Sequence, residues 1–133
     1  MPAFFVSIGR FWITLTTCIV ILVLCFINVE MAPAAPMTNF DKLAHAVMFA
    51  GLSGVVFFDN TRYLRRAIRF RRIFSGSFLF PVVFGGLIEI VQGYATPHRS
   101  GDWMDFLFDA MGVGVGLLSC WRINRRLNPP ANE

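Results

Sequence analysis

Four long apolar blocks constrain this chain more than any other feature of its sequence. A helix of about 20 apolar residues crosses the roughly 30 Å hydrocarbon core of a bilayer, and each block is close to that length. The sequence therefore predicts an all-α membrane bundle of four transmembrane helices, built as a single domain over residues 1–133. We expect the spans at about residues 11–29, 43–58, 73–92 and 103–121.

The composition supports a membrane protein. Hydrophobic residues make up 56% of the chain and charged residues 15%, whereas charged residues are about a quarter of a typical soluble domain. Trp103 and Trp121 stand at the two ends of the last block, about 27 Å apart along a helix. Because tryptophan prefers the membrane interface, this spacing matches one bilayer core.

The first block has a second interpretation, as a signal peptide, since Ala32-Pro33-Ala34 has the small residues of a cleavage site. Its apolar run is longer than the about 7–15 residues of a signal core, and only Arg10 charges the region before it. We therefore expect this block to stay in the protein as a transmembrane helix.

The three cysteines, Cys18, Cys25 and Cys120, all lie inside apolar blocks. They have no Cys-x-x-Cys spacing, so the pattern favours neither a disulfide framework nor a zinc site. We expect the cysteines to act as small packing residues, and we expect no cofactor.

Arginine is concentrated in a predicted loop over residues 59–72 and in the C-terminal tail. The positive-inside rule places both segments in the cytoplasm, and with four spans both termini are then cytoplasmic. Leu64, Ala67 and Ile68 alternate with the loop arginines, a pattern typical of a short helix lying on anionic lipid. This location explains the basic charge, so we expect membrane lipids and no nucleic acid as partners.

With this orientation, the polar residues of the spans gather in one layer near the outer surface. Residues three, four or seven apart share one face of a helix, which groups them into three sets. The sets are Lys42 with His45, Glu89 with Gln92, and Asp102 with Asp105 and Asp109, and the outer loop adds Arg99. We predict that these residues converge on one polar pocket in the outer leaflet.

A charged side chain in a membrane helix costs roughly 2.5–3.5 kcal/mol at mid-span, so the buried acids need compensation. Arg99 is the expected partner because its guanidinium grips a carboxylate with two hydrogen bonds; Lys42 or a protonated carboxyl would serve instead. The cluster is then either a structural ion-pair network or a ligand site. A divalent metal held by His45, Glu89 and the aspartates is a further alternative, but no helix carries a His-x-x-x-His pair, so we expect no metal site.

Small residues and one proline predict how the helices pack. Gly112 and Gly116 form a Gly-x-x-x-Gly pair that allows two helices to approach closely. We expect Gly85 and Gly86 to do the same on the third span. Pro81 lies mid-span, where it should kink the helix and leave a nearby carbonyl without its usual partner.

Three segments resemble, in order and spacing, the signature segments of the VanZ-like family of small bacterial membrane proteins. They are DKLAHAVMFAGLSGVVFF (41–58), GGLIEIVQG (85–93) and HRSGDWMDFLFDAMGVGVG (98–116). The resemblance covers about residues 41–116, and the family pattern carries over at Lys42, His45, Glu89, Gln92, Arg99 and Asp105. The sequence departs from the pattern at Asp109, where family members commonly have Asn.

The resemblance implies a multi-pass protein of the bacterial inner (cytoplasmic) membrane, part of the cell envelope. The founding member of the family is implicated in low-level antibiotic resistance, to teicoplanin, a lipoglycopeptide that binds cell-wall precursors outside the membrane. We therefore expect the pocket to bind an anionic amphiphile, such as a lipid-linked cell-wall precursor or a lipoglycopeptide.

Two functions are compatible with the polar residues. In a binding protein, Arg99 with Lys42 or His45 would hold an anionic head group. In a membrane-embedded enzyme, the alternative, His45 or Glu89 would be the catalytic general base acting on a lipid-linked substrate. No Ser-His-Asp or Cys-His spacing indicates a covalent nucleophile, so we favour the binding protein.

Overall fold

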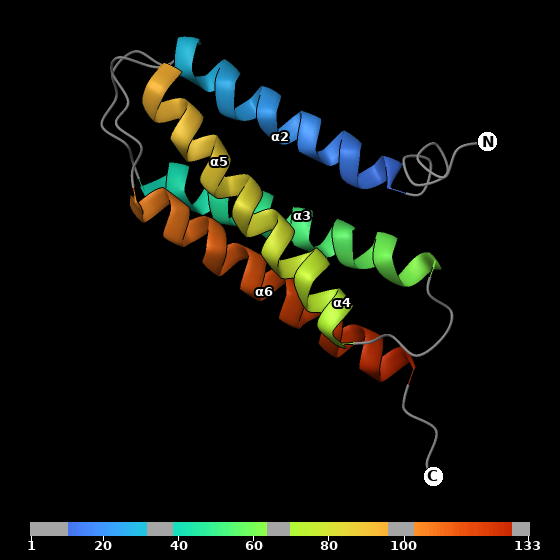
Figure 1. The fold of residues 1–133 in the computed structure, drawn as a ribbon. Helices are drawn as coiled ribbons and strands as arrows, with labels where there is room; N and C mark the ends of the chain where they lie inside the picture. The colour runs from blue at the N-terminus through green and yellow to red at the C-terminus, as the bar shows by residue number, and fades with distance from the viewer. Residues whose placement is uncertain (1–10, 32–38, 64–69, 96–102, 129–133) are drawn as a thin grey trace, which may run out of the picture.

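The computed structural model describes residues 11–31, 39–63, 70–95 and 103–128. The elements are α2 (Trp12–Met31), α3 (Asn39–Tyr63), α4 (Phe70–Phe74), the π-helix η1 (Ser75–Leu79), α5 (Phe80–Ala95) and α6 (Trp103–Leu127). Because α4, η1 and α5 follow one another without a break, the described residues build four helical rods and contain no strand (Figure 1). The predicted all-α fold is confirmed.

Three of the rods are long and apolar enough to cross a membrane: Lys42–Arg62, Arg71–Tyr94 and Trp103–Leu127. The remaining rod, α2, has 20 residues, of which Trp12–Phe26 form its described apolar part. The ends of the predicted loop 59–72 are helical, since α3 continues to Tyr63 and α4 begins at Phe70. Asp59 therefore belongs to a helix, and the structure shows why: its side chain is buried against α2.

Large apolar side chains cover much of the surface of the bundle, and several polar side chains are buried inside it. Large hydrophobic side chains such as Val47, Leu87 and Ile90 are more than half exposed. The buried polar and charged residues include His45, Ser53, Asp59, Ser77, Glu89, Gln92, Asp105 and Asp109. An apolar outside suits lipid, and polar groups shielded from lipid must find their partners inside the bundle.

Helices α3 and α6 lie side by side and make the most extensive contact in the bundle (Figure 1). Gly112 and Gly116 of α6 lie directly against the backbone of Ala46 and Ala50 of α3, where no β-carbon would fit. Both pairs are four residues apart, so one turn of α6 repeats the contact of the previous turn. The predicted close packing through Gly-x-x-x-Gly is confirmed.

Cross-helix contacts fix the direction of the rods. Thr14, at the start of α2, contacts Asp59 near the end of α3, whereas Cys25, further along α2, contacts Gln92 near the end of α5. Because Gly112 and Gly116 of α6 lie against Ala46 and Ala50 of α3 in the same order, the start of α2, the end of α3 and the end of α6 lie at one end of the bundle (Figure 1). We refer to it as the arginine end, because the described arginines lie there: Arg62, Arg71, Arg72, Arg122, Arg125 and Arg126. Which compartment this end faces stays a prediction.

Pro81 accounts for a hydrogen bond between two rods. Proline has no N–H, so the carbonyl of Ser77, four residues earlier, loses its usual helical donor. The hydroxyl of Ser53 on α3 donates to that carbonyl at 2.7 Å, and both serines are fully buried. The π-helix η1 ends just before Pro81. The prediction of a carbonyl freed by this proline is confirmed.

We expect Ser53→Ala to cost about 0.6 kcal/mol of stability, the average for interhelical hydrogen bonds in membranes, and at most about 1.7 kcal/mol. Pro81→Ala restores the backbone N–H, so in that background the loss of Ser53 should cost less. Unfolding of the wild type, both single variants and the double variant in detergent completes the thermodynamic cycle. An equal cost of Ser53→Ala in both backgrounds would contradict this account of the carbonyl.

Candidate functional site

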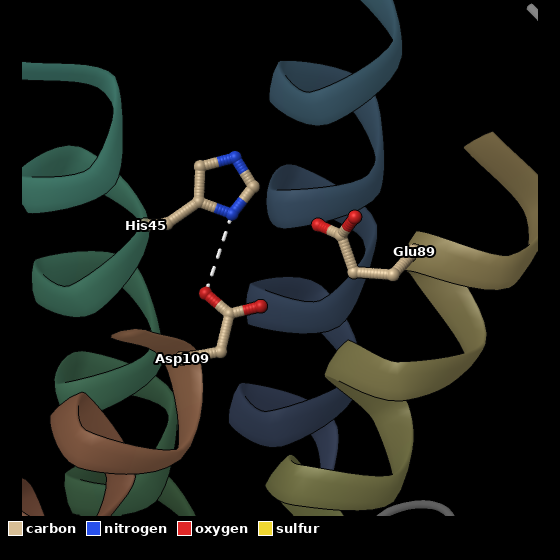
Figure 2. A group of neighbouring side chains, drawn as sticks. All are labelled: His45, Glu89 and Asp109. Carbon is tan, nitrogen blue, oxygen red and sulfur yellow. Dashed lines mark hydrogen bonds and ion pairs between the residues drawn. The ribbon is translucent and has the colours of Figure 1, made fainter. Parts of the chain in front are cut away.

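Three polar side chains meet between α3, α5 and α6, at the end of the bundle opposite the arginine end. Figure 2 shows His45, Glu89 and Asp109 turned toward one another, each from a different helix. The Nδ1 atom of His45 lies 3.2 Å from Oδ1 of Asp109. One nitrogen or oxygen from each of the three side chains falls within 4.8 Å of the other two. We call His45, Glu89 and Asp109 the polar triad.

The polar triad is shielded from its surroundings. The exposed fractions are 4% for His45, 9% for Glu89 and 1% for Asp109. Oδ2 of Asp109 accepts no hydrogen bond from the described residues. Charged groups in such a position are stable only when paired or neutralised.

Glycines hold the triad in place from two sides. Gly112 lies one turn beyond Asp109 and packs on Ala46, which follows His45, so the tightest helix contact is adjacent to the pair. A β-carbon at Gly85 would stand 3.2 Å from Oδ2 of Asp109 and 3.0 Å from the ring of Phe49. The glycine thus leaves room for this carboxylate, and its predicted role in close packing extends to the site itself.

A groove opens beside the triad between α5 and α6. Its volume is about 660 Å³, and its lining is Gly86, Glu89, Ile90, Gly93, Tyr94, Trp103 and Phe106. Small-molecule sites are commonly of this size, mostly apolar, with few polar groups. Glu89 is the one ionisable group in this described lining except for the phenol of Tyr94, and it also belongs to the triad. Through Glu89, the apolar groove therefore reaches the buried polar triad.

A second cavity of about 300 Å³ lies nearer the arginine end. Its described lining is Ile73, Phe74, Phe78, Gly114, Leu117, Leu118 and Trp121. This lining has no ionisable side chain, so the cavity offers no acid–base or ligand chemistry. Among the described residues, the polar triad is the group of three His, Cys, Asp or Glu side chains whose donor atoms lie close together.

The sequence profile of the VanZ/LLP1 family matches residues 3–124 of the chain. This chain belongs to the VanZ/LLP1 family. The match includes the first helix as well as the three segments on which the resemblance rests, and it covers every residue of the polar triad. No curated protein and no solved structure matches the chain. With its apolar helices, this VanZ/LLP1 member is an integral membrane protein.

The other predicted site residues of the VanZ/LLP1 chain have different surroundings. Gln92 is buried, and its amide donates to the backbone carbonyl of Cys25 at 3.2 Å, which ties α5 to α2. Asp105 is buried one turn before Asp109. Lys42 lies one turn before His45, with Nζ 6.0 Å from the centre of the Phe108 ring. Arg99 and Asp102 lie outside the described residues, so the pairing of Arg99 with the acids stays a prediction.

Sequence reasoning missed the buried acid at the arginine end. The carboxylate of Asp59 accepts hydrogen bonds from the Thr14 backbone N–H at 3.0 Å and the Thr14 hydroxyl at 2.7 Å. Our expectation that polar groups gather in one layer was therefore incomplete. A signal was present: Asp59 lies three and seven residues after Val56 and Leu52, on the same buried face of α3.

Proposed function

We propose that this VanZ/LLP1 member binds an anionic amphiphile in the groove between α5 and α6, with a lipid-linked cell-wall precursor as the ligand class. The observation that carries the proposal is the continuity of an apolar, aromatic groove with the buried polar triad. The hydrocarbon chain would lie along Ile90 and Phe106. Burying it would contribute about 0.8 kcal/mol per CH₂ group.

The head group in this proposal lies beyond Glu89, where the groove meets the triad. A carboxylate repels an anion, so positive charge must come from neighbouring groups. Lys42 is one turn from His45, and Arg99 precedes α6 in the sequence; both serve as the anion-binding groups of the proposal. Glu89, Asp105 and Gln92 would then position these cations.

The predicted orientation of the bundle places the proposed site near the outer surface of the membrane. The positive-inside rule puts the arginine end in the cytoplasm, with both termini, and the triad in the outer half of the bacterial inner membrane. A lipid-linked precursor and a lipoglycopeptide both place a hydrocarbon chain and a polar head at this depth. Binding either one would lower susceptibility to teicoplanin.

A second candidate, a membrane-embedded enzyme, is favoured by the contact between His45 and Asp109. A carboxylate at 3.2 Å from Nδ1 holds an imidazole in one orientation and supports its use as a general base. In that case a bound lipid-linked substrate would be converted to a product of different mass.

We expect Ile90→Trp to fill the groove and to reduce the bound amphiphile at least about tenfold, since displacing two CH₂ groups already forfeits about 1.6 kcal/mol. Val83→Trp is the matched control, because Val83 lies two turns earlier on the same face of α5 and outside the groove lining. Native mass spectrometry of protein purified from bacterial membranes, with undecaprenyl diphosphate as the added probe, measures occupancy. Equal occupancy in the wild type and Ile90→Trp would contradict the proposal, and a product peak would favour the enzyme.

A further inference from the structure

The donor atoms of the polar triad have the chemistry of a metal site. They are one imidazole nitrogen and two carboxylate groups, which zinc and the neighbouring divalent transition metals accept together. Each donor comes from a different helix, His45 from α3, Glu89 from α5 and Asp109 from α6 (Figure 2). Three protein ligands are the usual number in a zinc site that keeps a fourth position open.

The distances fit a tetrahedral ion after a small adjustment. Zinc bonds of about 2.0–2.2 Å place any two tetrahedral donors about 3.3–3.6 Å apart. Nδ1 of His45 and Oδ1 of Asp109 are 3.2 Å apart, close to this spacing. The donor set as a whole lies within 4.8 Å, so Glu89 needs to approach by about 1 Å, which rotation of its flexible side chain can provide.

The charge of the triad points to a cation. Two carboxylates close together in a buried site repel each other. Oδ2 of Asp109 is buried without a hydrogen bond from the described residues, and it lies against Gly85, where no side chain competes for space. A divalent ion neutralises both carboxylates at once.

The helix packing prepares the site in advance. His45 and Asp109 stand next to the contact of Ala46 with Gly112, in which backbone meets backbone. This contact leaves the two ligands little freedom to separate, and a site held in geometry before binding costs less to occupy. The buried amide of Gln92, one turn from Glu89, bonds to Cys25 of α2 and steadies the end of α5.

We propose that His45, Glu89 and Asp109 bind one divalent transition-metal ion, zinc being the chemical type that the donors fit best. With three protein ligands the ion keeps a fourth coordination position open, and one of the three ligands, Glu89, lines the groove. The ion also removes the net negative charge from that end of the groove. Metal binding does not rest on the proposed amphiphile, because the protein alone supplies the three ligands.

The test is zinc binding to purified, chelator-dialysed protein in detergent, measured by calorimetry and elemental analysis. We expect one zinc per chain for the wild type. Asp109→Asn keeps the size of the side chain and removes its charge. We expect Asp109→Asn and His45→Gln each to lower zinc affinity at least about tenfold, because removing a residue that only supports a metal ligand already lowers affinity by about that much. Asp59→Asn is the matched control, since Asp59 is also a buried acid but lies at the arginine end, and it should leave zinc binding unchanged.

Cobalt(II) can replace zinc in the wild-type protein, so this second test does not depend on whether a variant folds. The wild type should give the visible spectrum of a tetrahedral cobalt ion with nitrogen and oxygen ligands. A thiolate charge-transfer band would assign the metal to Cys18, Cys25 or Cys120 and overturn the proposal. Failure of the dialysed wild type to rebind zinc would also overturn it. Both measurements are made without amphiphile, so a negative result for metal binding does not contradict amphiphile binding in the groove.

Discussion

Gly112→Ala is expected to destabilise the protein by about 1–3 kcal/mol, the usual cost of overfilling a packed contact. A β-carbon at this position would meet the carbonyl oxygen, carbonyl carbon and Cα of Ala46. All three are backbone atoms of α3, so relief requires one helix to move away from the other. Thermal unfolding in detergent, followed by circular dichroism and by size-exclusion chromatography, measures the loss.

Gly114→Ala is the matched control for this prediction. It is the same substitution on the same helix, two residues away, and its β-carbon meets nothing within 4 Å. Alanine in a helix is more favourable than glycine by about 0.5–1 kcal/mol, so this variant should be neutral or more stable than the wild type. A similar loss of stability in both variants would show that close packing of α3 on α6 is not the cause.

The same substitution is expected to reach the polar triad. Because Ala46 follows His45 and Gly112 lies one turn beyond Asp109, separating the helices at this point lengthens the distance between the two side chains. Gly112→Ala should therefore also weaken zinc binding, whereas Gly114→Ala should not. The α3–α6 contact thus supports both the fold and the site.

The sequence predicted the parts of the fold that depend on one helix at a time. Length and apolarity gave the helical rods, because a span must satisfy its own backbone hydrogen bonds. The spacing of Gly112 and Gly116 predicted a flat face, and Pro81 predicted a carbonyl in need of a donor, which the structure identifies as that of Ser77. Each of these conclusions follows from covalent structure within a few turns of one helix.

The partners across helices could not be predicted in the same way. Periodicity assigns a face to His45 or Asp109, but not the rotation and height of one helix against the next. The contact of His45 with Asp109 at 3.2 Å therefore comes from the structure alone, while Arg99, the expected partner of the acids, lies outside the described residues. The absence of a His-x-x-x-His pair on one helix likewise does not decide the alternative of a metal held by His45, Glu89 and the aspartates, since donor atoms from three different helices meet in the triad.

Asp59 shows how one residue can hold two helices together. Thr14 is in the first turn of α2, where backbone N–H groups have no carbonyl four residues earlier within the helix. The first backbone bond of this region runs from the N–H of Leu15 to the carbonyl of Phe11. The carboxylate of Asp59 thus caps α2 from a neighbouring helix, and the positive end of the helix dipole favours its charge.

We expect Asp59→Leu to cost about 2–5 kcal/mol, because it leaves two buried donors of Thr14 without an acceptor at the start of a helix. The loss should be local, so hydrogen exchange followed by mass spectrometry should show faster exchange at the start of α2 while α3 and α6 stay protected. Thr14→Val removes one of the two donors and should produce a smaller effect of the same kind. Thr17→Val is its matched control, since the Thr17 hydroxyl bonds to Ile13 within α2. Uniformly faster exchange in all four rods would mean that Asp59 stabilises the whole bundle and does not act as the cap of α2.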